Sequence, residues 1–124
     1  MSNKNTASTV LYPEFFTPSQ WRKAKKNDID GKNLLDLPPV VKLFTPDGAA
    51  TWLISSVSRA NPALAFGLCD LGLGFPELGY VNLDELSELR GQLGLPVERD
   101  CHCCLDKSLR YYANKADQRR SIEV

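Results

Sequence analysis

The sequence lacks both an excess of positive charge and a long apolar run, the two features that would favour binding of the whole molecule to an anionic partner or its insertion into a membrane. Its 15 Lys and Arg residues are balanced by 15 Asp and Glu residues, so the formal net charge is zero. Such a protein has no overall field to draw it onto DNA, RNA or an anionic membrane, although a local patch still could. The sequence also lacks any run near the roughly twenty apolar residues that a membrane-spanning helix needs. We therefore expect no membrane partner.

Two further absences concern the N-terminus and histidine. Residues 1–9 are polar and lack the apolar stretch of a signal peptide, so we expect a cytoplasmic protein with a disordered tail over residues 1–10. The single histidine, His102, lies directly between Cys101 and Cys103, where neighbouring side chains diverge. The sequence therefore shows no Ser-His-Asp or Cys-His arrangement for nucleophilic catalysis.

Local signals predict three helices. Thr17 and Gln20 form a capping box ahead of a helix over 18–26, and Phe16 and Trp21 stand at the two positions of a hydrophobic staple. A second helix begins after Asn82, with an apolar stripe at helical spacing and a glycine to end it. The residues of that stripe and its stop are Leu83, Leu86, Leu89, Leu93 and Gly91. Ser108 caps a C-terminal helix over about 108–119.

Five β-rich segments alternate with turn residues. They span 40–45, 51–57, 63–73, 77–81 and 95 to about 103. Pro46-Asp47-Gly48 marks a hairpin turn, and Gly67 and Gly72 inside the third segment predict bulges or close backbone approach. Tight turns between successive strands favour antiparallel pairing. We therefore predict a single α+β domain over 11–124, in which about three helices lie on one face of a twisted antiparallel sheet of about five short strands.

Several strings of the sequence resemble one family. They are VKLFTPDG at 41–48, TWLI at 51–54, FGLCDLGLGFPELGYV at 66–81, LDEL at 83–86 and LPVERD at 95–100. Together they are similar to a small uncharacterised prokaryotic domain of unknown function, over a core of 39–100. The resemblance implies a setting on plasmids, phages and other mobile elements, and it brings no catalytic residues with it. The cluster at 101–104 departs from the apolar strand end that the resemblance implies.

The four cysteines raise the question of a metal site. Without a secretion signal we expect reduced thiols rather than disulfides. Cys69, Cys101 and Cys103 are candidate zinc ligands. On a strand, however, Cys101 and Cys103 would share one face while His102 and Cys104 take the other, and one tetrahedral site would need both. We favour thiols that act as small hydrophobic side chains, and expect no metal or other cofactor.

Acidic residues near turn glycines suggest a second possibility, a metal-dependent enzyme acting on nucleic acid. The candidate catalytic residues are Asp70, Glu77, Glu98 and Asp100, and three or more would have to meet in one cleft. The alternative is structural: Asp47 serves its turn, and Glu98 and Arg99 are solvated strand residues. We favour the structural alternative.

The glycine-rich segment 71–80 predicts a bulged hairpin that presents Phe75 and Tyr80 outward, as binding hot spots do, unless both lie in the core. Glu77 and Trp52 are further candidate partner contacts. From these residues and the resemblance we expect a non-enzymatic protein-binding accessory or inhibitor protein of a mobile element. An inhibitor of a host defence complex, of the anti-CRISPR or anti-restriction type, fits this description.

Two basic stretches leave a nucleic-acid-binding module as a further alternative. They are the run at 22–26 and the segment 107–120, which includes Tyr111 and Tyr112. Such stretches can contact phosphates. They are also typical of solvated helix faces, and zero net charge favours that interpretation. Neither the identity of a partner nor the oligomeric state follows from the sequence.

Overall fold

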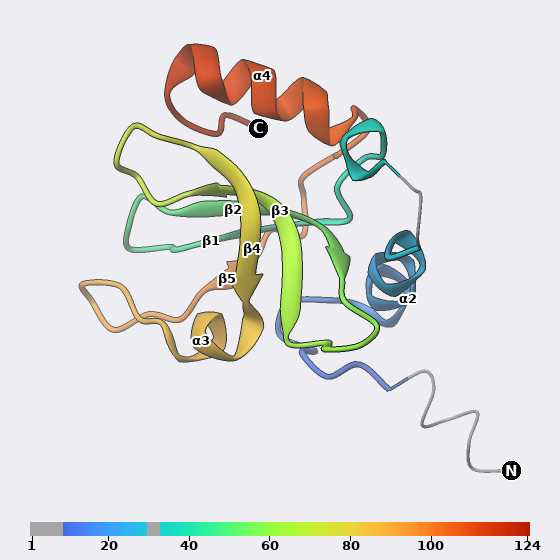
Figure 1. The fold of residues 1–124 in the computed structure, drawn as a ribbon. Coiled ribbons are helices and arrows are strands. Elements are labelled where there is room, and N and C mark those ends of the chain that lie inside the picture. Colours follow the sequence, from blue (N-terminus) through green and yellow to red (C-terminus); the bar gives the residue numbers. More distant parts are fainter. Residues whose placement is uncertain (1–8, 30–32) are drawn as a thin grey trace, which may run out of the picture.

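The computed structural model describes residues 9–29 and 33–124, and Figure 1 shows their arrangement. Within these residues the elements are α2 (Pro18–Asn27), the 3₁₀ turn η1 (Leu34–Asp36), β1 (Val41–Phe44), β2 (Thr51–Val57), β3 (Leu64–Asp70), β4 (Glu77–Asn82), α3 (Leu83–Glu88), β5 (Glu98–Arg99) and α4 (Leu109–Arg119). The predicted α+β class is confirmed. Most of the tail predicted over 1–10 lies outside the described residues, and Val10 is partly buried against the core.

The five strands form one antiparallel sheet in the order β4-β3-β2-β1-β5. β1 to β4 follow one another as a meander because each connection between them is a short turn. After α3 the chain returns to the far side of the sheet, where β5 pairs with β1. The sheet therefore has two open edges, β4 and β5, which are built very differently.

Helices cover both faces of this sheet, so the prediction of one covered face is wrong (Figure 1). Trp52 and Ile54 of β2 pack into the larger core with residues of α2 and α3. Leu53, which points to the opposite face, packs with Leu109 and other residues of α4. A strand that is buried on both sides has no polar alternation, and TWLISSV carries none. Nothing in such a strand says where each helix will pack.

The helix caps agree with the sequence signals. The Thr17 hydroxyl accepts the Gln20 N–H at 3.1 Å, and the Gln20 side chain accepts the Thr17 N–H at 2.9 Å. The Phe16 and Trp21 rings meet at 5.2 Å between centroids. The Asn82 side chain accepts the N–H groups of Asp84 and Glu85 in the first turn of α3. The Ser108 hydroxyl caps α4 by accepting the Tyr111 N–H.

The second helix is shorter than predicted. α3 ends at Glu88, and Leu89 already has extended dihedrals of φ −69° and ψ 137°. Only the first half of the apolar stripe is therefore buried, while Leu89 and Leu93 are exposed. Gly91 is not a helix stop. Its backbone packs against the Asp47 carboxylate, where a Cβ would have no room.

Two strands also end earlier than predicted, each because an aspartate turns the chain. The Asp70 carboxylate accepts the Gly72 N–H at 2.8 Å, and Gly72 has a φ of +81° that ends β3. The Asp100 carboxylate accepts the His102 N–H at 2.9 Å, so β5 stops after two residues and the cysteines beyond it are not on a strand. The close backbone approach predicted for Gly67 is confirmed, because a Cβ there would lie 1.9 Å from the Leu53 carbonyl oxygen.

Candidate functional site: the β4 edge of the sheet

The candidate catalytic carboxylates do not meet. Asp70 is buried, and its second oxygen accepts the Ile122 N–H at 2.9 Å, which holds the C-terminal segment against β3. Asp100 lies beside β1 at the other end of the strand order, 3.4 Å from the Lys42 amino group. Glu77 and Glu98 are exposed on the two opposite edge strands. Within the described part of the chain, no group of three or more His, Cys, Asp or Glu side chains is placed to hold a metal ion.

The candidate zinc ligands lie in different surroundings. Cys69 is partly buried on β3 opposite Glu77, and burial together with that carboxylate raises the pKa of its thiol to about 11. Cys101 is exposed in the bend after β5, and its thiol contacts the Arg99 carbonyl at 3.8 Å. Burial likewise raises the pKa of Cys103. The four cysteines are free thiols.

The outward-facing side of β4, here called the β4 edge, has hydrogen-bonding groups without a neighbouring strand. The Leu83 N–H bonds the Ala63 carbonyl at 2.7 Å, which fixes the alternation of the β3–β4 ladder. Residues at odd positions of β4 therefore turn their backbone groups toward β3. Leu78 and Tyr80 turn theirs outward, since the pattern alternates along an antiparallel strand. No residue that the structure describes pairs with that side of β4.

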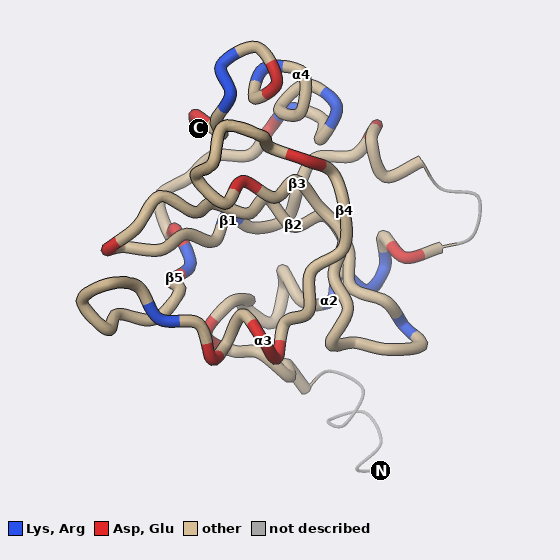
Figure 2. The backbone as a smooth tube through the Cα atoms, turned by 60° about the vertical axis from the view of Figure 1, so that its left-hand side comes forward, with Lys and Arg blue, Asp and Glu red and all other residues tan. Residues whose placement is uncertain are grey.

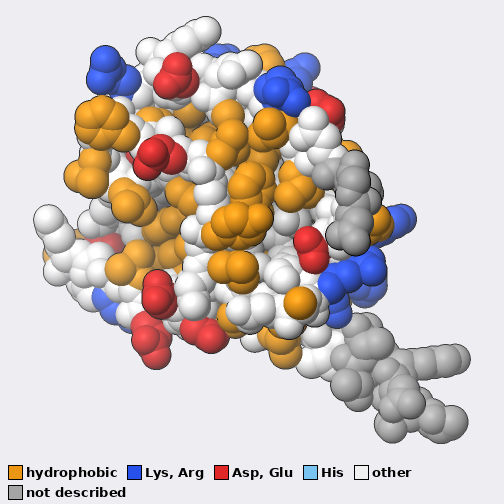
Figure 3. Space-filling view, viewed as in Figure 1, with side chains coloured by type: hydrophobic (Ala, Val, Ile, Leu, Met, Phe, Trp, Pro, Cys, Tyr) orange, Lys and Arg blue, Asp and Glu red, His pale blue; other side chains and the backbone are white. Residues whose placement is uncertain are grey.

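Apolar side chains accompany this open backbone. Tyr80 is 70% exposed, and its ring contacts the ring of Phe66 at 5.2 Å between centroids. Leu78 is also exposed and pairs with Leu68, so both β4 side chains lie on the face that α4 partly covers. The hairpin tip, residues 71–76, adds further exposed apolar side chains, which are Leu71, Leu73 and Phe75. Figure 3 shows hydrophobic side chains gathered over the middle of this view, with charged groups around them.

The hairpin tip also borders a hollow of about 390 Å³. It lies between the tip and the end of α4, and its charged lining residues are Glu77, Asp117 and Arg120. Phe75 and Pro76 form part of its wall. A side chain of another molecule placed in this hollow would therefore lie beside two carboxylates and one guanidinium group.

Of the four candidate partner contacts, Phe75, Glu77 and Tyr80 are exposed together on or beside β4. Trp52 is not, because it is only 2% exposed and packs in the larger core next to Ile54. An aromatic residue in a strand does not reveal by itself which side it faces. We therefore leave Trp52 out of the candidate surface.

Sequence reasoning missed Leu71, Leu73 and Leu78. A signal for the first two was present, since they alternate with Gly72 and Gly74, whose φ values are +81° and +88°. Leucines placed between such glycines in a tight turn have little structure around them to bury them. Leu78 carried no such signal, because its exposure depends on β4 being an edge strand.

The basic residues of the C-terminal helix have local partners. Arg110 pairs with Asp36 at 3.1 Å, and Arg119 pairs with Glu123 at 2.8 Å. Lys107 and Lys115 lie over the Tyr111 ring, at 6.0 and 5.4 Å from its centroid. This helix therefore resembles a solvated helix face more than an open phosphate-binding surface.

Comparison with known proteins places the chain in a family without naming an activity. Neither a curated protein nor a solved structure matches the sequence. No helix in residues 9–29 and 33–124 has the length and apolar character needed to span a bilayer. The model of one family, described as "Protein of unknown function (DUF2958)", matches residues 17–123. The chain therefore belongs to the DUF2958 family.

Proposed function

We propose that this protein works by binding a protein partner rather than by catalysis, and that the partner adds an extended strand to the β4 edge. One observation carries the proposal: β4 presents outward backbone groups at Leu78 and Tyr80 beside exposed apolar side chains. Edge strands of this kind are templates for pairing, and proteins normally blunt them with Lys, Pro, bulges or very short strands. β4 has six residues in regular register, with neither Lys nor Pro among them.

The proposed strand addition implies a chemistry for the partner segment. A strand antiparallel to β4 would form hydrogen bonds with the outward groups of Leu78 and Tyr80. The partner residues directly opposite these two lie on the same face of the extended sheet, two positions apart. Because Tyr80 and Phe66 already form an apolar platform on that face, the partner should carry apolar side chains at those alternate positions.

The hollow beside the hairpin tip suggests a further preference. An added strand that runs past Phe75 reaches the space lined by Glu77, Asp117 and Arg120. Two carboxylates against one guanidinium group favour a basic side chain there, because opposite charges attract at a partly desolvated surface. The partner segment is thus extended, alternately apolar, and basic at one end.

The resemblance supports a setting for this interaction. It associates the family with plasmids, phages and other mobile elements of prokaryotes. In that setting a small binding protein in the cytoplasm would serve as an accessory protein or as an inhibitor of a host defence complex of the anti-CRISPR or anti-restriction type. The strand-addition surface is the part of this protein that would engage such a complex.

Position-specific crosslinking tests the proposal. A photoreactive phenylalanine derivative is placed at position 80 and, as the matched control, at position 93, because Leu93 is also an exposed apolar residue but lies in the α3–β5 loop. We expect one protein to crosslink from position 80 and not from position 93, and mass spectrometry identifies it. The affinity of the purified pair is then measured with Tyr80→Lys, which should weaken binding about 30-fold, as loss of a hot spot does.

A backbone substitution separates strand addition from simple side-chain contact. Leu78→Pro removes an N–H that points away from β3, so the β3–β4 ladder keeps its hydrogen bonds. Strand addition requires that N–H, and the variant should lose binding while its thermal unfolding stays close to that of the wild type. Leu93→Lys should leave affinity unchanged. Equal affinity of wild type, Tyr80→Lys and Leu78→Pro would refute the proposal.

A further inference from the structure

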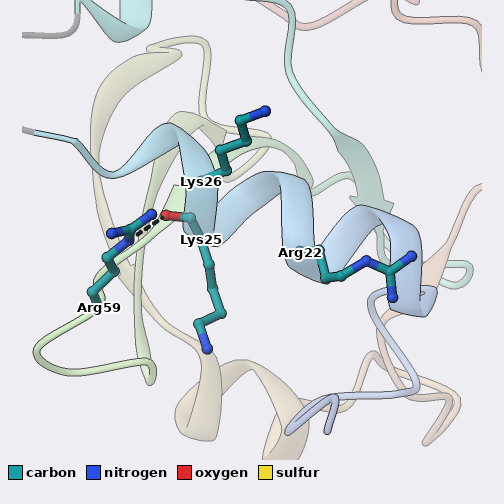
Figure 4. Close-up of a pocket in the computed structure, with 4 residues that line it drawn as sticks. All are labelled: Arg22, Lys25, Lys26 and Arg59. Atoms are coloured by element: carbon teal, nitrogen blue, oxygen red, sulfur yellow. Dashed lines mark hydrogen bonds between the residues drawn. The ribbon is translucent and has the colours of Figure 1, made fainter. Parts of the chain in front are cut away.

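Four basic side chains line an open hollow of about 400 Å³ at the C-terminal half of α2. They are Arg22, Lys25 and Lys26 from the helix and Arg59 from the loop between β2 and β3 (Figure 4). This group is called the basic hollow below. It lies at the opposite end of the sheet from the hairpin tip, because successive turns of a meander alternate between its two ends.

Specific contacts hold Arg59 against the helix. Its side-chain Nε–H donates to the Lys25 carbonyl at 3.0 Å, and its backbone N–H donates to the Asp28 carboxylate at 2.8 Å. The helix itself is fixed to β2, since the buried Asn27 amide donates to the Ser55 carbonyl at 2.9 Å. The four positive charges therefore sit on two elements whose relative position is set by hydrogen bonds.

None of these four side chains forms an ion pair among the described residues, and the nearby Asp28 carboxylate bonds the backbone of Arg59 rather than its guanidinium group. Interaction with the helix dipole explains why Lys25 and Lys26 are favourable in the last turn of α2. It does not account for Arg22, which lies earlier in the helix, or for Arg59, which is not in it. Figure 2 shows basic residues on α2 and acidic residues on α3.

We infer that the basic hollow binds phosphate groups linked in a row, as in the backbone of a nucleic acid strand. Figure 4 shows that Lys25 and Lys26 extend in different directions and that Arg22 lies nearer the start of the helix. Charges spread in this way suit successive phosphates better than one compact anion. The lining consists of basic side chains, so the contacts position a backbone and do not read bases. The inference is independent of the proposed function, because it uses different residues at a different end of the sheet.

Fluorescence anisotropy with a labelled 20-nucleotide oligothymidylate tests this inference, with the full chain at 50 to 200 mM salt. Four phosphate contacts predict a slope of about −3 in log affinity against log salt, or a loss of about 50-fold over that range. Lys26→Gln should reduce the slope by about 1. Lys23→Gln is the matched control, because Lys23 is exposed on the same helix and does not line the hollow. It should leave affinity and slope unchanged.

Competition with tripolyphosphate distinguishes a nucleic acid from a free polyphosphate as the source of the phosphates. Displacement only at concentrations far above those of unlabelled oligothymidylate identifies the nucleic acid, and displacement at equal phosphate concentration identifies a short polyphosphate. Both results support the inference. It is overturned if neither probe binds at 50 mM salt, or if Lys23→Gln weakens binding as much as Lys26→Gln and Arg59→Gln do. Circular dichroism melting confirms that each variant is folded.

Discussion

The two edges of the sheet differ in length and in the side chains that they expose. β4 is six residues long, keeps a regular register with β3, and exposes Leu78 and Tyr80. β5 is two residues long and consists of the charged residues Glu98 and Arg99. The Arg99 carbonyl contacts the Cys101 thiol, and its guanidinium group donates to the Pro13 carbonyl at 3.4 Å. One edge is thus protected in the ways that soluble proteins use, and the other is not.

The difference leaves the β4 edge without the protection that β5 has. An open apolar edge carries a risk of aggregation, and a chain of this size had the means to remove it, as β5 shows. The proposed partner strand would cover the β4 edge. The following predictions test whether the two edges differ as strongly in energy and reactivity as they do in geometry.

The largest effect should come from two glycines that face each other in the β3–β4 ladder. Gly67 in β3 is paired with Gly79 in the β4 edge strand. A Cβ at Gly67 would lie 1.9 Å from the Leu53 carbonyl oxygen, whereas a Cβ at Gly79 would meet nothing within 4 Å. Gly67→Ala should therefore destabilise the fold by about 3 kcal/mol or more. Gly79→Ala should stabilise it by roughly 0.4–1 kcal/mol, because it restricts the unfolded chain.

Chemical denaturation of the two variants measures this contrast directly. A loss below about 1 kcal/mol for Gly67→Ala would show that β2 and β3 can separate without cost at their bulge. A large loss for Gly79→Ala would show that β4 is already crowded on its open side. Either result would break the distinction between an inner strand and a free edge.

These glycines also show what the sequence could reveal. Both lie in β-rich segments, and the residues around them do not show which glycine lies close to a neighbouring backbone and which has open space beside it. The caps at Thr17 and Asn82 were predictable because their partners lie two or three residues away. The position of β4 at an edge was not, because it depends on β5 crossing to β1 after α3. That step is non-local, and no residue of β4 encodes it.

The candidate surface shows the same limit. Tyr80 and Trp52 are both aromatic residues in strands, yet one is exposed and the other lies in the core. Hydrophobic patterning gives the face of a strand but not the element that covers it. Arg59 was missed for a related reason, because it joins the basic run of α2 only when the β2–β3 loop folds back onto the end of that helix.

The next effect concerns the loop that leads into the protected edge. The Asp47 carboxylate accepts the N–H groups of Leu93 and Leu95, at 2.6 and 3.3 Å, and so holds this loop against the β1–β2 turn. Its other oxygen is buried without a hydrogen-bond partner among the described residues. Removing the side chain therefore also removes the desolvation free energy that this oxygen costs the folded state. Asp47→Ala should therefore destabilise the fold by about 2 kcal/mol, less than two charged hydrogen bonds would give.

Urea unfolding of Asp47→Ala and Asp47→Asn measures this contribution. The asparagine variant keeps one acceptor oxygen and should lose less. Amide exchange at Leu93 and Leu95 should accelerate in the alanine variant, because both N–H groups become free. Unchanged exchange at these two amides would contradict the assignment of Asp47 as the anchor of this loop.

A smaller effect is the acid sensitivity of the β5 edge. The pKa of Asp100 is lowered, chiefly because its carboxylate accepts the His102 N–H. Burial opposes this effect, and the nearby Lys42 amino group adds to the lowering. A carboxyl whose pKa folding lowers contributes stability above its unfolded pKa, and loses it as the pH falls through the folded value. Asp100→Asn should therefore be less stable than the wild type at pH 7. The two should be equally stable once the pH lies below both the folded and the unfolded pKa of Asp100.

Carbon-detected NMR of the Asp100 carboxyl provides the measurement. Lys42→Met is the matched control, since it removes the cation and keeps the turn. Its effect on the Asp100 pKa should be smaller than that of disrupting the turn itself. An Asp100 that titrates as a free aspartate in the wild type would show that the bend after β5 is not held by this carboxylate.

The smallest effect is a difference in reactivity between two thiols, one near each edge. Cys101 follows β5 and is exposed, whereas Cys69 lies under β4 opposite Glu77, where burial and that carboxylate raise its pKa to about 11. At pH 8 only about one Cys69 thiol in a thousand is ionised, and only the thiolate reacts. Cys69 should therefore react with an aromatic disulfide reagent at least about 100-fold more slowly than Cys101. Glu77→Gln removes the lesser of the two causes and should speed Cys69 only slightly. Rapid modification of Cys69 in the folded wild type would mean that β4 opens readily from β3. A strand that detaches so easily could not offer the stable edge that the proposed partner binding requires.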